Sequence, residues 1–186
     1  MWCKTMAINE SMVKLGKVRS VIRETFEYGN RRAQEIGREN VFDFSLGNPS
    51  VPAPVAVHDA MQRLLQEENP VVLHGYTSAT GAPATRAAIA DDINARFAAN
   101  VFENDIYMTC GAAASLTISI HAIACPGDEI ITIAPFFPEY RVFVESAGAH
   151  LVVVPAEQGT FQMDLQAIAN AITPRTKAII LNTPNN

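Results

Sequence analysis

IYMTCGAAASLTISIHAIACPGDE, residues 106–129, joins a short apolar run to a helix-forming segment through a single glycine, Gly111. Further apolar runs follow along the chain, with a helix-forming segment in each interval. The runs are residues 129–134, 151–154 and 177–181, and the helical segments between them are residues 138–147 and 164–172. This alternation is typical of right-handed β-α-β units and predicts a parallel sheet. The near-continuous Ile and Val of the runs predict strands that helices cover on both faces.

The first part of the chain has a different pattern. Apolar side chains recur at helical spacing over residues 11–37, and Gly37 is placed to end that helix in a left-handed conformation. A loop rich in Pro, Gly, Asn and Ser follows, and two more helices are predicted, around residues 57–65 and from Pro83 onward. We therefore predict an α/β protein with two parts. They are a helical N-terminal arm, residues 1–40, and a three-layer αβα domain with a mainly parallel sheet, residues 41–186, in which four strands are present.

The composition excludes several classes of protein. Of the 186 residues, 14 are Lys or Arg and 19 are Asp or Glu, which gives a formal net charge of −5. An acidic chain without a basic stripe is unsuited to nucleic acid, whose binding depends on neutralising phosphates. The apolar runs are too short to span a bilayer, so no membrane is expected. Cys3, Cys110 and Cys125 have neither metal-binding nor disulfide spacing, which favours a cytoplasmic protein.

The turn at Gly111 is suited to binding an anion. A helix opens directly after it with Ala112 and Ala113, and the first amide groups of a helix together with its dipole attract negative charge. Glycine permits close approach of the backbone, and the small alanines leave room for a phosphate. A tight strand-to-helix turn that binds nothing has the same sequence. The chain has no GxGxxG or GxxxxGK[ST] motif, so dinucleotide and P-loop sites are not favoured.

Two later strand ends carry residues that suit an aromatic ligand. Phe136 and Phe137 follow one strand, and either ring can stack on a flat heteroaromatic ring or belong to the core. Asn182 and Asn186 follow the last strand and offer amide donors, or form an ordinary turn. Because the carboxyl ends of parallel strands share one edge of a sheet, these residues and the Gly111 turn are expected to lie together. The combination favours a phosphorylated aromatic cofactor.

Five motifs in this order resemble the class I and II aminotransferases of fold-type I. They are FSLGNPSVP, HGYTSATGAPATRAAIA, TCGAAASL, CPGDEIITIAPFFPEY and LNTPNN, and together they extend from about residue 41 to residue 186. The resemblance implies a pyridoxal 5′-phosphate cofactor and amino-group transfer between an amino acid and a 2-oxo acid. It also implies a homodimer. The fold it implies is the large domain of fold-type I, here truncated.

The resemblance also assigns roles to individual residues. Backbone amides at residues 111–113 would bind the cofactor phosphate, Phe137 would stack on the pyridine ring, and Asn186 would bind the phenolic oxygen with Asn182 nearby. Tyr76 resembles the tyrosine that reaches the cofactor phosphate of the neighbouring subunit, and Gly47 resembles the loop glycine beside the substrate carboxylate. The cofactor-binding residues implied in this way are Gly111, Ala112, Ala113, Phe137, Asn182, Asn186 and Tyr76.

The catalytic residues of the family have no counterpart here. Its Schiff-base lysine, the aspartate that pairs with the pyridine nitrogen, and the arginine that binds the substrate carboxylate are all expected beyond Asn186. No catalytic residue is therefore expected within this chain, and residues 1–186 alone are expected to be inactive. Three alternatives stay open: a lyase or decarboxylase on the same scaffold, a non-catalytic pyridoxal-binding regulatory module, and a fragment without independent activity.

Overall fold

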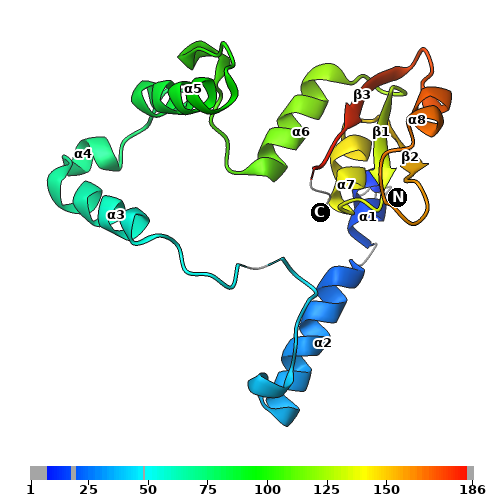
Figure 1. The fold of residues 1–186 in the computed structure, drawn as a ribbon, viewed down its shortest axis with the longest axis horizontal. Coiled ribbons are helices and arrows are strands. Elements are labelled where there is room, and N and C mark those ends of the chain that lie inside the picture. Colours follow the sequence, from blue (N-terminus) through cyan, green and yellow to red (C-terminus); the bar gives the residue numbers. More distant parts are fainter. Residues whose placement is uncertain (1–7, 18–19, 48, 184–186) are drawn as a thin grey trace, which may run out of the picture. The chain divides into compact units, whose positions relative to one another are not determined.

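The computed structural model describes residues 8–17, 20–47 and 49–183 (Figure 1). Two compact units make up the chain. The first combines Met1–Leu46 with Ala112–Asn186, and the second is Gly47–Gly111. The boundary expected at residue 40, between arm and large domain, stays a prediction.

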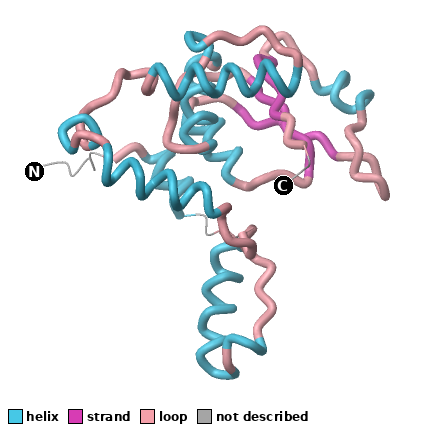
Figure 2. The backbone as a smooth tube through the Cα atoms, turned by 60° about the vertical axis from the view of Figure 1, so that its left-hand side comes forward, coloured by secondary structure: helices cyan, strands magenta, loops and turns pink. Residues whose placement is uncertain are grey.

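A three-stranded parallel sheet lies in the first unit, drawn in magenta in Figure 2. Its strands are β1, Glu129–Ala134, β2, His150–Pro155, and β3, Thr176–Ile180, and they lie in the order β2-β1-β3. In this register Ile131 of the central strand lies opposite Val152 of β2 and Ile179 of β3. The α/β class and the parallel pairing predicted from the sequence are confirmed.

Two helices cover one face of the sheet. They are α6, Ala112–Ile123, and α7, Glu139–Ser146. Ile120 of α6 and Val144 of α7 are buried against Ile130 of β1, which is 0% exposed. Both helices were expected from the spacing of their apolar residues.

The opposite face of the sheet is covered by α8, Leu165–Ala171. Ile168 of this helix packs on Ile131 and Val154, and Ile131 is 0% exposed. The carboxylate of Asp164 accepts a hydrogen bond from the Ala167 amide at 2.8 Å, so Asp164 is the N-cap of α8. With helices on both faces, this part of the first unit has the predicted three layers.

The strand expected at residues 106–109 is not formed, which corrects the prediction of four strands. A strand requires a neighbour that completes a ladder of backbone hydrogen bonds. Across this stretch the Met108 amide donates to the Thr80 carbonyl at 3.0 Å, but no described segment pairs with it as a strand. The apolar pattern alone was therefore insufficient.

The N-terminal residues form helices, as expected, but two of them. α1 is Glu10–Lys17 and α2 is Val21–Ile36. The amide of Gly37 donates to the Ala33 carbonyl, so Gly37 ends α2 as the sequence predicts. Its φ is 91°, but its ψ of 141° differs from the left-handed helical conformation that was expected. A short 3₁₀ turn, η1, Arg38–Asn40, follows.

The second unit is helical. Its elements are α3, Val55–Glu67, α4, Pro70–Leu73, α5, Pro83–Phe97, and the 3₁₀ turn η2, Glu103–Asp105. Both long helices were predicted, and Pro83 opens α5 because the missing amide of proline costs nothing at a first helical position. Within the described ranges, no helix is long and apolar enough to cross a membrane.

The amino ends of the strands are joined by a buried carboxylate. Glu129, at the start of β1, accepts a hydrogen bond from the Thr173 hydroxyl at 2.6 Å and one from Arg175 Nε at 2.9 Å. Thr173 and Arg175 lie in the segment that leads into β3. These hydrogen bonds hold the pKa of Glu129 below its ordinary value of 4.5, and the bond from Thr173 contributes most.

We predict that Glu129→Gln lowers the melting temperature of the intact protein, and that the difference depends on pH. Because folding lowers the pKa of Glu129, its carboxylate stabilises the fold above pH 4.5, and this contribution is lost as the pH falls through the lower pKa of the folded state. Thermal melts of wild type and Glu129→Gln at a series of pH values should therefore converge in acid. Glu145→Gln, which removes only the surface pair with Arg141, is the control and should have little effect. A difference that stays constant down to acid pH would contradict the assignment.

Candidate functional site

The turn at Gly111 has the geometry that suits an anion. Gly111 has a φ of 90°, and α6 begins at the next residue. A Cβ atom built on Gly111 would meet no atom within 4 Å, so the space beside its backbone is open. Ala112 and Ala113 are exposed and lie in the first turn of α6, where amide groups have no acceptor within the helix. The sequence predicted the start of this helix correctly.

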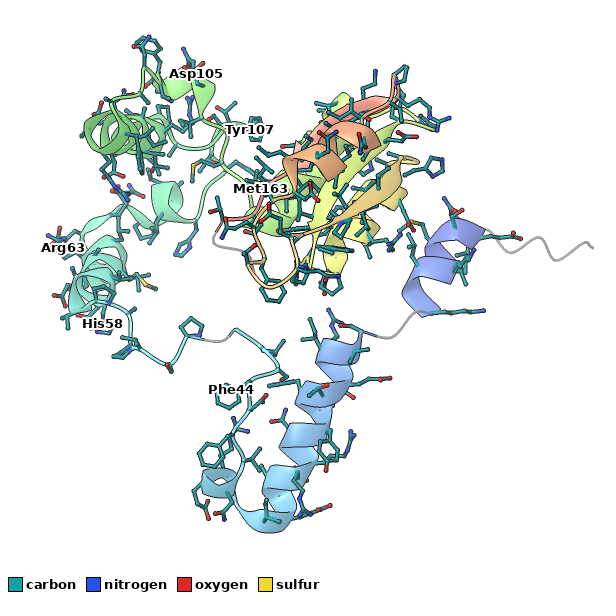
Figure 3. The ribbon with its side chains drawn as sticks, turned by 45° about the vertical axis from the view of Figure 1, so that its right-hand side comes forward. Phe44, His58, Arg63, Asp105, Tyr107 and Met163 are labelled. Carbon is teal, nitrogen blue, oxygen red and sulfur yellow. The ribbon has the colours of Figure 1, made fainter. Side chains whose placement is uncertain are left out.

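A cavity of about 490 Å³ lies at the carboxyl edge of the sheet. Its walls come from the ends of β1 and β3, from the turn into α7, and from the loop 160–163 that follows β2. Met163, labelled in Figure 3, belongs to that loop. Cavities of roughly 300–1,000 Å³ are the size that holds small ligands and cofactors.

Four aromatic side chains lie at or beside this cavity, one of them Phe161 of the loop 160–163. Phe136 and Tyr140 line it, and their ring centroids are 6.5 Å apart with the planes 14° from parallel. Phe137 is half-buried and meets Tyr140 edge to face, with centroids 5.7 Å apart and planes at 80°. Phe137 is not among the described lining residues of the cavity, but it adjoins one that is.

Asn182 is the polar residue of this site that lacks a partner. It follows β3 and lines the cavity, and its side-chain nitrogen Nδ2 is buried without a hydrogen-bond partner. Asn186, expected to act with it, lies outside the described residues. Among the described side chains that line the cavity none is charged, so the site offers hydrogen bonds and aromatic surface instead of ion pairs.

Gly47 and Tyr76 belong to the second unit, and both are exposed. The loop after Tyr76 is held by the buried Arg86, whose guanidinium donates to the carbonyls of Glu103 at 2.7 Å and Gly81 at 3.3 Å. The loop is therefore anchored while the tyrosine ring projects into solvent. Neither Gly47 nor Tyr76 is among the cavity-lining residues that the structure describes.

Sequence reasoning missed two parts of this site. Tyr140 received no role, although it lies three residues after Phe137 at the start of a helix, a spacing that brings side chains together. The loop 160–163 has no motif that marks it. Its place at the cavity follows from the parallel order β2-β1-β3, which brings the carboxyl end of β2 beside that of β1.

Comparison with known protein families shows the family to which this fold belongs. The family model for aminotransferase class I and II matches residues 39–186. The chain belongs to the class I and II aminotransferases. An amino transferase from Eubacterium rectale has a crystal structure with a TM-score of 0.91 and 53% sequence identity, over 97% of this chain and 46% of that one.

Curated aminotransferases show the same partial coverage. The aspartate/prephenate aminotransferase of Thermus thermophilus is 33% identical over 161 residues, which are 84% of this chain and 40% of that protein. The kynurenine–oxoglutarate transaminase 3 of Bos taurus is 32% identical over 158 residues, which are 79% of this chain and 34% of that protein. The chain therefore spans less than half the length of these aminotransferases.

The lysines and the potential metal ligands that the structure describes contribute nothing to this cavity. Among the described residues, Lys177 of β3 lies at the amino edge of the sheet, where its Nζ is 4.0 Å from Asp128 Oδ1. Lys14 and Lys17 are on α1. Within the described part of the aminotransferase chain, no group of three or more His, Cys, Asp or Glu side chains could hold a metal ion.

We predict that Gly111→Ala destabilises the intact aminotransferase by about 1–2 kcal/mol, because a residue with a Cβ is strained at the φ of 90° that Gly111 adopts. Steric overlap makes no contribution, since the position is open. Equilibrium urea unfolding measures the change. The matched control is Gly16→Ala in α1, which also meets no atom within 4 Å and should be neutral or stabilising by up to about 1 kcal/mol. Equal effects at the two glycines would show that the positive φ is not required.

Proposed function

We propose that the intact protein is a pyridoxal-phosphate-dependent aminotransferase that moves an amino group from an amino acid to a 2-oxo acid. Family membership supports this, together with one observation: Asn182 Nδ2 is buried without a partner beside a cavity at the carboxyl edge of the sheet. A buried donor without a partner costs about 1–3 kcal/mol, so its presence favours a ligand that accepts its hydrogen bond.

The residues at this edge, together with those at the start of α6, fit pyridoxal phosphate, the cofactor that the resemblance to class I and II aminotransferases implies. The start of α6 suits a phosphate group, because a Cβ atom at Gly111 would meet nothing within 4 Å. Phe136 and Phe137 supply aromatic surface, and Asn182 supplies a donor for an oxygen on the ring. Anion site, aromatic rings and amide donor are the three kinds of group that a phosphorylated pyridine requires.

Each group then has a distinct task. The amides at residues 111–113 would bind the phosphate, and Phe137 would stack on the pyridine ring and keep water from that face. Asn182 and Asn186 would donate hydrogen bonds to the ring substituents and so orient the ring. When bound, pyridoxal phosphate supplies an electron sink for negative charge on the substrate carbon.

The covalent lysine of this reaction is proposed to lie outside residues 1–186. Lys177 lies at the amino edge of the sheet beside Asp128, which is the end opposite the cavity. Lys14 and Lys17 belong to α1, and no lysine is among the cavity-lining residues that are described. An amine that bonds the cofactor must reach the carboxyl edge, and none of these three side chains lines the cavity there.

Substrate recognition is assigned to the loop at Gly47. Its backbone is proposed to approach the substrate carboxylate, since a glycine leaves no side chain in the way: a Cβ atom there would meet nothing within 4 Å. The preceding turn is ordered by Asp43, whose carboxylate accepts hydrogen bonds from the Ser45 hydroxyl at 2.6 Å and amide at 2.9 Å. These bonds hold the pKa of Asp43 below its ordinary value.

We place the reaction in the cytoplasm. Cys110 and Cys125 are free and exposed. Exposed free thiols persist in a reducing compartment and are oxidised outside it.

The partner of the intact protein is proposed to be a second copy of itself. Helix α3 carries exposed apolar side chains at helical spacing, and Tyr76 projects from an anchored loop that follows it. The exposed large apolar side chains of α3 are Val55, Val57, Met61, Leu64 and Leu65. An apolar face of this kind marks an interaction surface, and a two-fold dimer is the commonest assembly. In the dimer, Tyr76 would reach the neighbour's cofactor phosphate.

We predict that analytical ultracentrifugation of the intact protein gives a dimer, and that Met61→Glu shifts it toward monomer, because a charge then lies in the apolar face. Glu67→Gln, at the end of the same helix, is the control and should leave the dimer unchanged. Active monomer at working concentration would contradict both the dimer and the role of Tyr76.

We predict that the intact protein, given pyridoxal phosphate, an amino acid and a 2-oxo acid, forms a new amino acid and the 2-oxo acid of the donor in equal amounts. Chromatography of both products over a panel of amino-acid donors measures this. Residues 1–186 alone should give no turnover. Release of ammonia or carbon dioxide without a new amino acid would instead indicate a lyase or a decarboxylase.

The role of Asn182 is tested in the same assay. Asn182→Ala should raise the pyridoxal phosphate concentration needed for half-maximal activity by roughly five- to tenfold, which corresponds to one lost hydrogen bond. Asn170→Ala is the matched control, since Asn170 is exposed on α8 and its side chain bonds only to Gln166 among the described contacts. Equal effects of the two substitutions would remove Asn182 from the site.

A further inference from the structure

Tyr140 is a buried residue that lies between the cavity at the carboxyl edge and the hydrophobic core. It is the second residue of α7 and is 7% exposed. One helical turn later on the same face, Val144 is 0% exposed in the cluster with Ile120 and Ile130. The backbone that carries Tyr140 is therefore fixed to the sheet, and its ring has little freedom to move.

Two separate contacts join Tyr140 to Phe137. The Tyr140 amide donates to the Phe137 carbonyl at 3.0 Å, which holds the backbone of the turn. The two rings meet edge to face at 5.7 Å, the arrangement that aromatic quadrupoles prefer. Because Tyr140 is buried and Phe137 is half-buried, one side of the Phe137 ring is supported and part of it stays accessible.

Phe136 has a weaker connection to the same tyrosine. Its ring lies 14° from parallel to Tyr140, but the centroids are 6.5 Å apart, near the outer limit for an attractive pair. No described backbone hydrogen bond joins Phe136 to Tyr140. Of the two phenylalanines, Phe137 is the one whose orientation Tyr140 determines.

We infer that Tyr140 is a positioning residue, whose buried ring holds Phe137 in the orientation that stacks on the cofactor ring. This rests on the proposed function, which assigns the stacking to Phe137. A ring that is already held in place loses less conformational entropy when the ligand binds. By holding the Phe137 ring, Tyr140 therefore raises the affinity for the cofactor. The tyrosine acts through its ring, and its hydroxyl is not required.

The test is a double-mutant cycle on the intact protein, with pyridoxal phosphate affinity as the first readout. Tyr140→Leu should weaken affinity roughly three- to tenfold, the range expected for one aromatic pair. Tyr140→Phe keeps the ring and should bind as wild type does. In a Phe137→Leu background, Tyr140→Leu should cause no further loss, because the ring that it supports is gone. Melting temperatures of the cofactor-free variants separate affinity from stability, since a purely structural role would lower stability with or without Phe137 and leave the affinities additive.

A second readout does not depend on the cofactor. In cofactor-free protein labelled with fluorophenylalanine, the ¹⁹F resonance of Phe137 should shift and narrow in Tyr140→Leu and stay as in wild type in Tyr140→Phe. Additive losses of affinity, coupling to Phe136→Leu in place of Phe137→Leu, or an unchanged Phe137 resonance would each overturn the inference. Wild-type protein that does not bind pyridoxal phosphate would overturn the proposed function, whereas normal binding with an additive cycle would overturn the role of Tyr140 alone.

Discussion

The central strand β1 is the constraint on which the rest of this structure depends. It pairs in parallel with a strand on each side, and its neighbouring residues Ile130 and Ile131 are both 0% exposed while pointing to opposite faces. Both faces of the sheet must therefore be covered, which α6 and α7 do on one side and α8 on the other. Parallel pairing also sends every strand's carboxyl end to the same edge, and so it creates the edge where the cavity lies.

Local sequence signals predicted most of this fold, because β1 and its neighbours are specified by short-range patterns. The strands predicted from runs of Ile and Val and the helix end at Gly37 were confirmed, and each depends on residues within a few positions. Residues 106–109 have the same apolar character as a strand but do not form one, since strand formation requires a partner segment. That requirement is non-local, and no periodicity in a single segment can reveal it.

The site was predictable in part for the same reason. The helix start at Gly111 and the position of Asn182 after β3 follow from local sequence and the shared edge. Tyr140 and the loop 160–163 were missed, because their place depends on how α7 packs and on which strand neighbours β1. Side-chain packing around a turn is decided by tertiary contacts. A sequence motif therefore identifies a residue proposed to contact a ligand more easily than it identifies the residue that packs against it.

The two edges of the sheet divide stability and function between them. At the amino edge Glu129 is bonded to Thr173 and Arg175, so its buried charge is compensated within the protein. At the carboxyl edge Asn182 Nδ2 is buried without a partner, and a buried donor of this kind costs about 1–3 kcal/mol. A ligand that accepts this hydrogen bond removes that cost, so its binding is coupled to the stability of the sheet edge. The hydrogen bonds at the amino edge stabilise the sheet, whereas the carboxyl edge retains an unpaired polar group that can bind a ligand.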